Sequence, residues 1–153
     1  MLIEALKRLK LISGRGKQTD LLRLCHAGRL VGGLSMSLRA TPDEVVGPLT
    51  HALGGEAKQF RVLDVRSGPP LELEMQAGAL HEKWEVRDVA ALIHNINDLY
   101  KDAPEVKVAA VLGEWDDMLE VWCVEKSVLP TLLRGRWLDA AFNAQTLWRL
   151  VER

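Results

Sequence analysis

The sequence predicts an α+β fold, an antiparallel β-sheet with helices packed on it. Two segments, 71–76 and 106–112, alternate apolar and polar or small residues with the period of a strand. Between them, segment 86–103 places apolar residues at helical spacing. A length of 153 residues is typical of one domain, so we expect a single domain over 1–153, with 1–40 as an N-terminal helical extension.

The sequence of the N-terminal extension predicts two helices, and it does not decide whether a strand follows them. The start, "MLIEALKRLKLI", mixes apolar and charged residues, which favours an amphipathic helix over a signal peptide. A short second helix is expected from Thr19 or Asp20 to Gly28. The alternation over 34–38 suggests an additional strand, whereas Gly32-Gly33 weakens it, and both readings of 30–38 stay open.

The next segment predicts a helix followed by a strand pair. Thr41 is expected at the N-cap, with Glu44 completing a capping box, and Gly54-Gly55 should end the helix. Segment 61–65 should pair with 71–76 through the turn at 67–70, and a further short strand is expected over 81–85.

The remaining elements are a central helix, a hairpin and C-terminal helices. The helix carries a buried stripe from Val86 to Tyr100 and ends at Pro104. Strands 106–112 and 119–123 are expected to form a hairpin through a turn at 113–117, with Trp115 at its tip and Trp122 on the face opposite Cys123. Ser127 should cap a short helix, and 137–151 should form a terminal helix.

No residue set predicts a catalytic, cofactor or metal site. The four histidines are scattered without a pair at i, i+4, and the two cysteines have no CxxC spacing. We therefore predict a protein that is not an enzyme and holds no cofactor. The enzyme alternative would require a deep pocket that contains several of four residues: Asp64, His81, Asp116 and Cys123. A net charge of -1 and the lack of a long apolar run favour a cytoplasmic protein without a membrane segment.

The aromatic and basic residues of the C-terminal half suggest two surfaces. Large aromatics supply much of the energy of protein interfaces, which makes four residues the predicted partner or dimer contacts: Trp115, Trp122, Trp137 and Trp148. Arginines beside aromatics are typical of single-strand binding, which makes three residues the candidate nucleic-acid contacts: Arg134, Arg136 and Arg149. The apolar positions of segment 137–151 also fit a core-facing stripe, so core and interface readings stay open.

The segments "TPDEVVGPLTHALGG", "LIHNINDLY" and "VKVAAVLGEWDDMLEVWCV" carry a family resemblance. From Thr41 on, the order of helix, two or three strands, helix, hairpin and helix resembles that of the YbjN-like proteins and the type III secretion chaperones. The resemblance implies a small homodimeric protein without catalysis, whose sheet or helix faces bind a partner polypeptide. If 30–38 forms a strand, 30–112 follows βαββαβ order, which favours a ferredoxin-like topology instead.

Together these observations favour a partner-binding or chaperone-like adaptor that is not an enzyme and that forms a homodimer. Its expected partners are a second copy of itself and another protein. The alternative is a nucleic-acid-associated α+β module, such as a single-strand-binding or repair accessory protein, with salt-sensitive binding.

Overall fold

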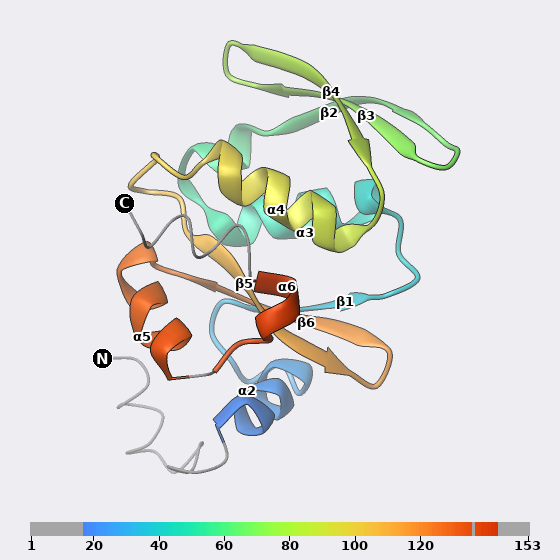
Figure 1. Ribbon diagram of the computed structural model, residues 1–153. Helices are drawn as coiled ribbons and strands as arrows, with labels where there is room; N and C mark the ends of the chain where they lie inside the picture. Colours follow the sequence, from blue (N-terminus) through green and yellow to red (C-terminus); the bar gives the residue numbers. More distant parts are fainter. Residues whose placement is uncertain (1–16, 136, 144–153) are drawn as a thin grey trace.

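The computed structural model describes residues 17–135 and 137–143, and Figure 1 shows their arrangement. They form two three-stranded antiparallel sheets and several helices, which confirms the predicted α+β class. In chain order the elements are α2 (Lys17–His26), β1 (Gly33–Ser37), α3 (Pro42–Leu53), η1 (Gly55–Gln59), β2 (Arg61–Arg66), β3 (Leu71–Ala77), β4 (Leu80–Val86), α4 (Val89–Leu99), β5 (Val108–Trp115), β6 (Met118–Val124), η2 (Lys126–Val128), α5 (Leu129–Arg134) and α6 (Ala140–Asn143).

The sheets and helices form layers. Sheet A has the order β1-β6-β5 and sheet B the order β2-β3-β4. Helices α3 and α4 lie between the two sheets, and α2 and α5 lie on the opposite side of sheet A (Figure 1). One apolar core joins sheet B, α3, α4 and one face of sheet A, while a second core joins α2, α5 and the other face.

Sheet A is therefore buried on both faces. Along β5, Ala109 and Val111 face the first core, whereas Val108, Ala110 and Leu112 face the second. A strand that is covered on both sides has nearly continuous apolar sequence, which is what β5 shows over residues 108–112. The sequence prediction of one buried face for this hairpin was thus incomplete.

Sheet B follows the predicted alternation. Leu73 and Met75 of β3 are 0% exposed in the first core, and Glu74 between them faces the other side. Strand β3 pairs with β2 as predicted and also with β4, and β4 is longer than the predicted 81–85. The central helix α4 begins at Val89, because the Asp88 carboxylate accepts a hydrogen bond of 2.8 Å from the Ala91 amide, and Val86, which was predicted on this helix, is the last residue of β4.

The helix that starts after Thr41 is also confirmed. The Glu44 carboxylate accepts a hydrogen bond of 3.1 Å from the Thr41 amide, and the helix closes at Gly54. The β5–β6 turn is shorter than predicted: strand pairing reaches Trp115, and only Asp116 and Asp117 turn the chain, with φ of 54° and 62°. Positive φ at both central residues is the geometry of a two-residue hairpin turn.

The C-terminal helices differ from the prediction. Ser127 lies within η2 rather than at an N-cap, and α5 starts at Leu129. Trp137 precedes α6, so the predicted helix over 137–151 does not begin there, and residues 144–151 lie outside the described part.

The open question about residues 30–38 is answered by β1, which pairs with β6. Its presence does not produce the ferredoxin-like alternative, since that topology needs one sheet and the strands divide between two. From α3 on, the order is helix, three strands, helix, two strands, helix. Among the described helices, none has the length and apolar character of a membrane span.

Candidate functional site

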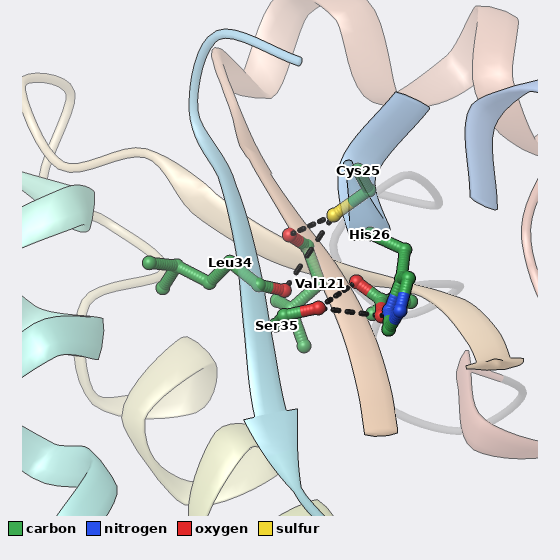
Figure 2. Close-up of polar contacts among 6 residues, drawn as sticks. Cys25, His26, Leu34, Ser35 and Val121 are labelled. Atoms are coloured by element: carbon green, nitrogen blue, oxygen red, sulfur yellow. Dashed lines mark hydrogen bonds and ion pairs between the residues drawn. The ribbon is translucent and has the colours of Figure 1, made fainter. Parts of the chain in front are cut away.

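A carboxylate is buried in the middle of sheet A. Glu120 of β6 is 0% exposed, and Ser35 lies opposite it on β1. The Ser35 hydroxyl donates a hydrogen bond of 2.5 Å to Glu120 Oε1 and also contacts Oε2. His26, the last residue of α2, brings Nδ1 to 2.8 Å from the same Oε1. Figure 2 shows His26 and Ser35 reaching this carboxylate from two different elements.

The thiol of Cys25 lies beside the same carboxylate. Its Sγ is 3.5 Å from the carbonyl oxygen of Leu34 on β1 and 3.6 Å from that of Val121 on β6 (Figure 2). Burial, followed by the hydrogen bond to Glu120 and the charge of Glu120, raises the pKa of the Cys25 thiol to about 12. The thiol is therefore protonated at neutral pH, as a hydrogen-bond donor must be.

We call Cys25, His26, Ser35 and Glu120 the Glu120 cluster. These residue types also occur in hydrolase sites, but the hydrogen bonds among them differ from those of a catalytic triad. A serine nucleophile needs a base such as histidine to accept its proton, whereas Ser35 and His26 both contact the Glu120 carboxylate. A thiol with a pKa of about 12 is a poor nucleophile at neutral pH. What these contacts do is tie α2, β1 and β6 together.

The β5 edge of sheet A is closed by two asparagine side chains. Asn97 of α4 donates Nδ2 to the Ala109 carbonyl and accepts the Ala109 amide through Oδ1, both at 2.9 Å. Asn143 of α6 pairs with Val111 in the same way, at 2.8 Å and 3.0 Å. Two carboxamides thus occupy the places that the peptide groups of another strand would take, and this edge is closed to strand addition.

The β1 edge has a different arrangement. The Cys123 amide donates to the Gly32 carbonyl at 2.9 Å, and the Leu38 amide donates to the Asp117 carbonyl at 3.2 Å. These bonds fix which residues of β1 direct their peptide groups toward β6, namely the even-numbered ones. The peptide groups of Gly33, Ser35 and Ser37 consequently point away from the sheet.

Only some of these outward groups have partners. The Gly33 amide donates to the Leu30 carbonyl, and the Ser37 carbonyl accepts the Ala40 amide. Four groups remain without a backbone partner among residues 17–135 and 137–143: the Gly33 carbonyl, both groups of Ser35, and the Ser37 amide. The β1 edge is therefore open.

A groove of about 1190 Å³ begins where β1 ends. Ser37 and Leu38 line it together with the first residues of α3 and α4 and the turn between β2 and β3. Pockets for small molecules have roughly 300–1,000 Å³, so the groove is larger than most of them. Both apolar and polar side chains line it, and the charged ones are three acidic residues and one basic residue: Glu85, Asp88, Glu114 and Arg87.

Two of the predicted interface tryptophans belong to the core instead. Trp122 is 0% exposed and its indole donates to the Val31 carbonyl at 3.0 Å, and Trp137 is 5% exposed in the same core. The prediction was wrong for this pair because α2 and α5 cover the face of sheet A that carries Trp122. Trp115 is half-buried at the hairpin end, and Trp148 lies outside the described residues.

The predicted basic surface is described only in part. Arg134 is exposed at the end of α5. Arg136 and Arg149 lie outside the described residues, so the nucleic-acid alternative stays a prediction.

The residues of the enzyme alternative lie in three different places. Asp64 and His81 flank Glu74 on sheet B, where His81 Nε2 is 2.6 Å from Glu74 Oε2. Asp116 lies in the β5–β6 turn. Cys123 is buried in the first core, and this burial raises the pKa of its thiol to about 12. The described structure does not bring these four residues into one pocket.

Comparison of the chain with protein-family models, curated proteins and solved structures found no match. The site is therefore interpreted from its own geometry.

The sequence analysis missed the three buried polar residues that define sheet A. Glu120 had a visible signal, since it is the one charged residue in the apolar strand 119–124. Asn97 and Asn143 had none, because an asparagine in a helix is ordinary and the strand that each one caps lies 12 or 32 residues away in the sequence.

Proposed function

We propose that this chain is a partner-binding adaptor without catalytic activity, which holds a segment of another polypeptide in the groove beside β1. The observation that carries the proposal is the groove of about 1190 Å³, which is lined by the ends of several elements. Its size suits an extended stretch of polypeptide better than a small metabolite. Mixed walls of this kind contact both the backbone and the side chains of a peptide.

The charges of the groove indicate the kind of segment. Three carboxylates and one guanidinium line it, so a segment with basic side chains complements it better than an acidic one. The resemblance to YbjN-like proteins and type III secretion chaperones supports a polypeptide partner and a homodimer. Two buried cysteines without a disulfide, Cys25 and Cys123, are typical of a reducing compartment and support a cytoplasmic location.

The test uses fluorescein-labelled dodecapeptides and measures anisotropy. One peptide alternates valine and lysine, and its control replaces each lysine by glutamate. Ala90 lines the groove, so Ala90→Trp should fill it, whereas Ala79 is exposed in the β3–β4 turn and Ala79→Trp serves as the matched control. We expect the basic peptide to bind, and Ala90→Trp to weaken binding by about tenfold or more, a loss of about 1.4 kcal/mol.

Equal binding by both tryptophan variants would show that the peptide sits elsewhere and would overturn the proposal. A labelled single-stranded oligonucleotide is measured in parallel at two salt concentrations. Salt-sensitive oligonucleotide binding without peptide binding would place the nucleic-acid alternative first.

A further inference from the structure

We propose that two copies of this chain pair through their β1 edges, antiparallel and around a twofold axis at Ser35. The pairing joins two copies of sheet A, each with three strands, into one continuous sheet. The inference names the dimer interface of the proposed adaptor, and it rests on that part of the proposed function alone. The groove and its peptide are not needed for it.

The first argument is hydrogen-bond complementarity. With the axis at Ser35, the Ser35 amide of each copy meets the Ser35 carbonyl of the other. Each Ser37 amide then meets the Gly33 carbonyl of the second copy. These are the four groups that lack a backbone partner within the described residues, and the two groups that would remain unmatched, the Gly33 amide and the Ser37 carbonyl, are already bonded within the chain. The edge is thus complementary to itself.

The second argument is that the same register brings apolar side chains of the two copies together. Leu34 lies opposite Met36 of the second copy, an apolar cross-strand pair on the face of the first core. Four large apolar residues are exposed in the described chain, and two of them, Val31 at 87% and Leu38 at 41%, flank β1. Dimerisation would cover both. An exposed apolar pair beside an open edge is typical of an interface.

The third argument is that β1 lacks the usual protection of an edge strand. Exposed edges normally carry charged residues or proline, which discourage pairing, and the sequence of β1, "GLSMS", has neither. The edge strands of sheet B, by contrast, carry Arg61, Asp64 and Arg66 on β2 and Glu82 and Lys83 on β4. Pairing is therefore expected at β1 rather than at sheet B.

The fourth argument is closure. Because Asn97 and Asn143 seal the β5 edge, each copy of sheet A offers one open edge. A pairing that uses this one edge twice ends at the dimer and does not continue into a filament. The Glu120 cluster holds Ser35, the residue at the axis, in place before the second copy arrives.

The test is the solution mass by light scattering after gel filtration, at two protein and two salt concentrations. We expect a salt-insensitive mass near twice 17.1 kDa. Ser37→Pro removes one of the pairing amides, and Ser37→Ala at the same position keeps it, so the first should give a monomer and the second a dimer. Val31→Lys should also give a monomer, because it replaces an exposed apolar side chain beside the pairing edge by a charged one.

Circular dichroism measures whether each variant is folded. If Ser37→Pro does not fold, Val31→Lys alone tests the interface. A monomeric wild type, or dimers that persist in both Ser37→Pro and Val31→Lys, would overturn the β1 interface. Because Val31 does not line the groove, a monomeric Val31→Lys that still binds the basic dodecapeptide separates this inference from the proposed function. Loss of peptide binding with an intact dimer would be a failure of the groove alone.

Discussion

Replacement of Asn97 by alanine tests how sheet A is closed at β5. The side chain makes two hydrogen bonds of 2.9 Å to the backbone of Ala109, and all of these groups are buried. Alanine leaves the Ala109 amide and carbonyl without partners in an apolar surrounding. Each buried polar group left unpaired costs about 1–3 kcal/mol, so the two together cost about 2–6 kcal/mol. The better helix propensity of alanine returns at most about 0.7 kcal/mol.

The matched control is Asn95→Ala. Asn95 lies on the same helix, two residues earlier, and lines the groove. Both variants gain the same helix propensity, so the difference between their free energies of unfolding isolates the pairing with Ala109. For a chain of this length, each kcal/mol corresponds to about 2–4 °C in Tm. We expect Asn97→Ala to melt some 5–20 °C below the control, as an order of magnitude from these values.

Urea unfolding followed by tryptophan fluorescence supplies the free energies, since Trp122 and Trp137 are buried and report on the second core. Midpoints that agree between Asn97→Ala and Asn95→Ala would refute the argument that carboxamides satisfy the β5 edge.

Three further outcomes are expected. Glu120→Ala should lower the free energy of unfolding by about 1–3 kcal/mol, because the Ser35 hydroxyl and the buried Cys25 thiol lose their acceptor, and His26→Ala should lower it at least as much, because it leaves the buried Glu120 carboxylate with fewer partners; urea unfolding measures both. Tyr100→Phe should raise it by up to about 1–3 kcal/mol in the same assay, since the buried Tyr100 hydroxyl has no partner among the described residues. The Cys25 and Cys123 thiols, both with a pKa of about 12, should resist a thiol reagent at pH 8 until the chain unfolds, and the free energy of unfolding should fall from about pH 9, where thiols of the unfolded chain ionise, toward pH 12.

Some elements of the fold can be predicted from residues that are close together in the sequence. Strand β3 has one face in the core and one in solvent, so its alternation of Leu73 and Met75 with glutamates gives both the strand and its orientation. The start of α3 depends on residues only three positions apart, Thr41 and Glu44, and its prediction needed no tertiary information.

Sheet A could not be predicted in the same way. Both of its faces are buried, so apolar residues on either face of β5 and β6 carry no information about which side is outside. Trp122 seemed available to a partner because nothing in the sequence says that α2 will cover it. The same holds for Glu120, whose contacts with His26 and Ser35 span 94 and 85 positions of the sequence. Such contacts exist only after the layers have assembled.

The two proposals meet at the end of β1. Ser37 contributes its amide to the β1 pairing, and the same residue lines the groove. In a dimer with its axis at Ser35, the two Ser37 residues lie four positions apart along the shared ladder, or about 13 Å at 3.3 Å per residue. The twofold axis therefore places one groove at each end of the β1 pairing. Each chain contributes its own groove, so an adaptor of this design should bind two partner segments per dimer.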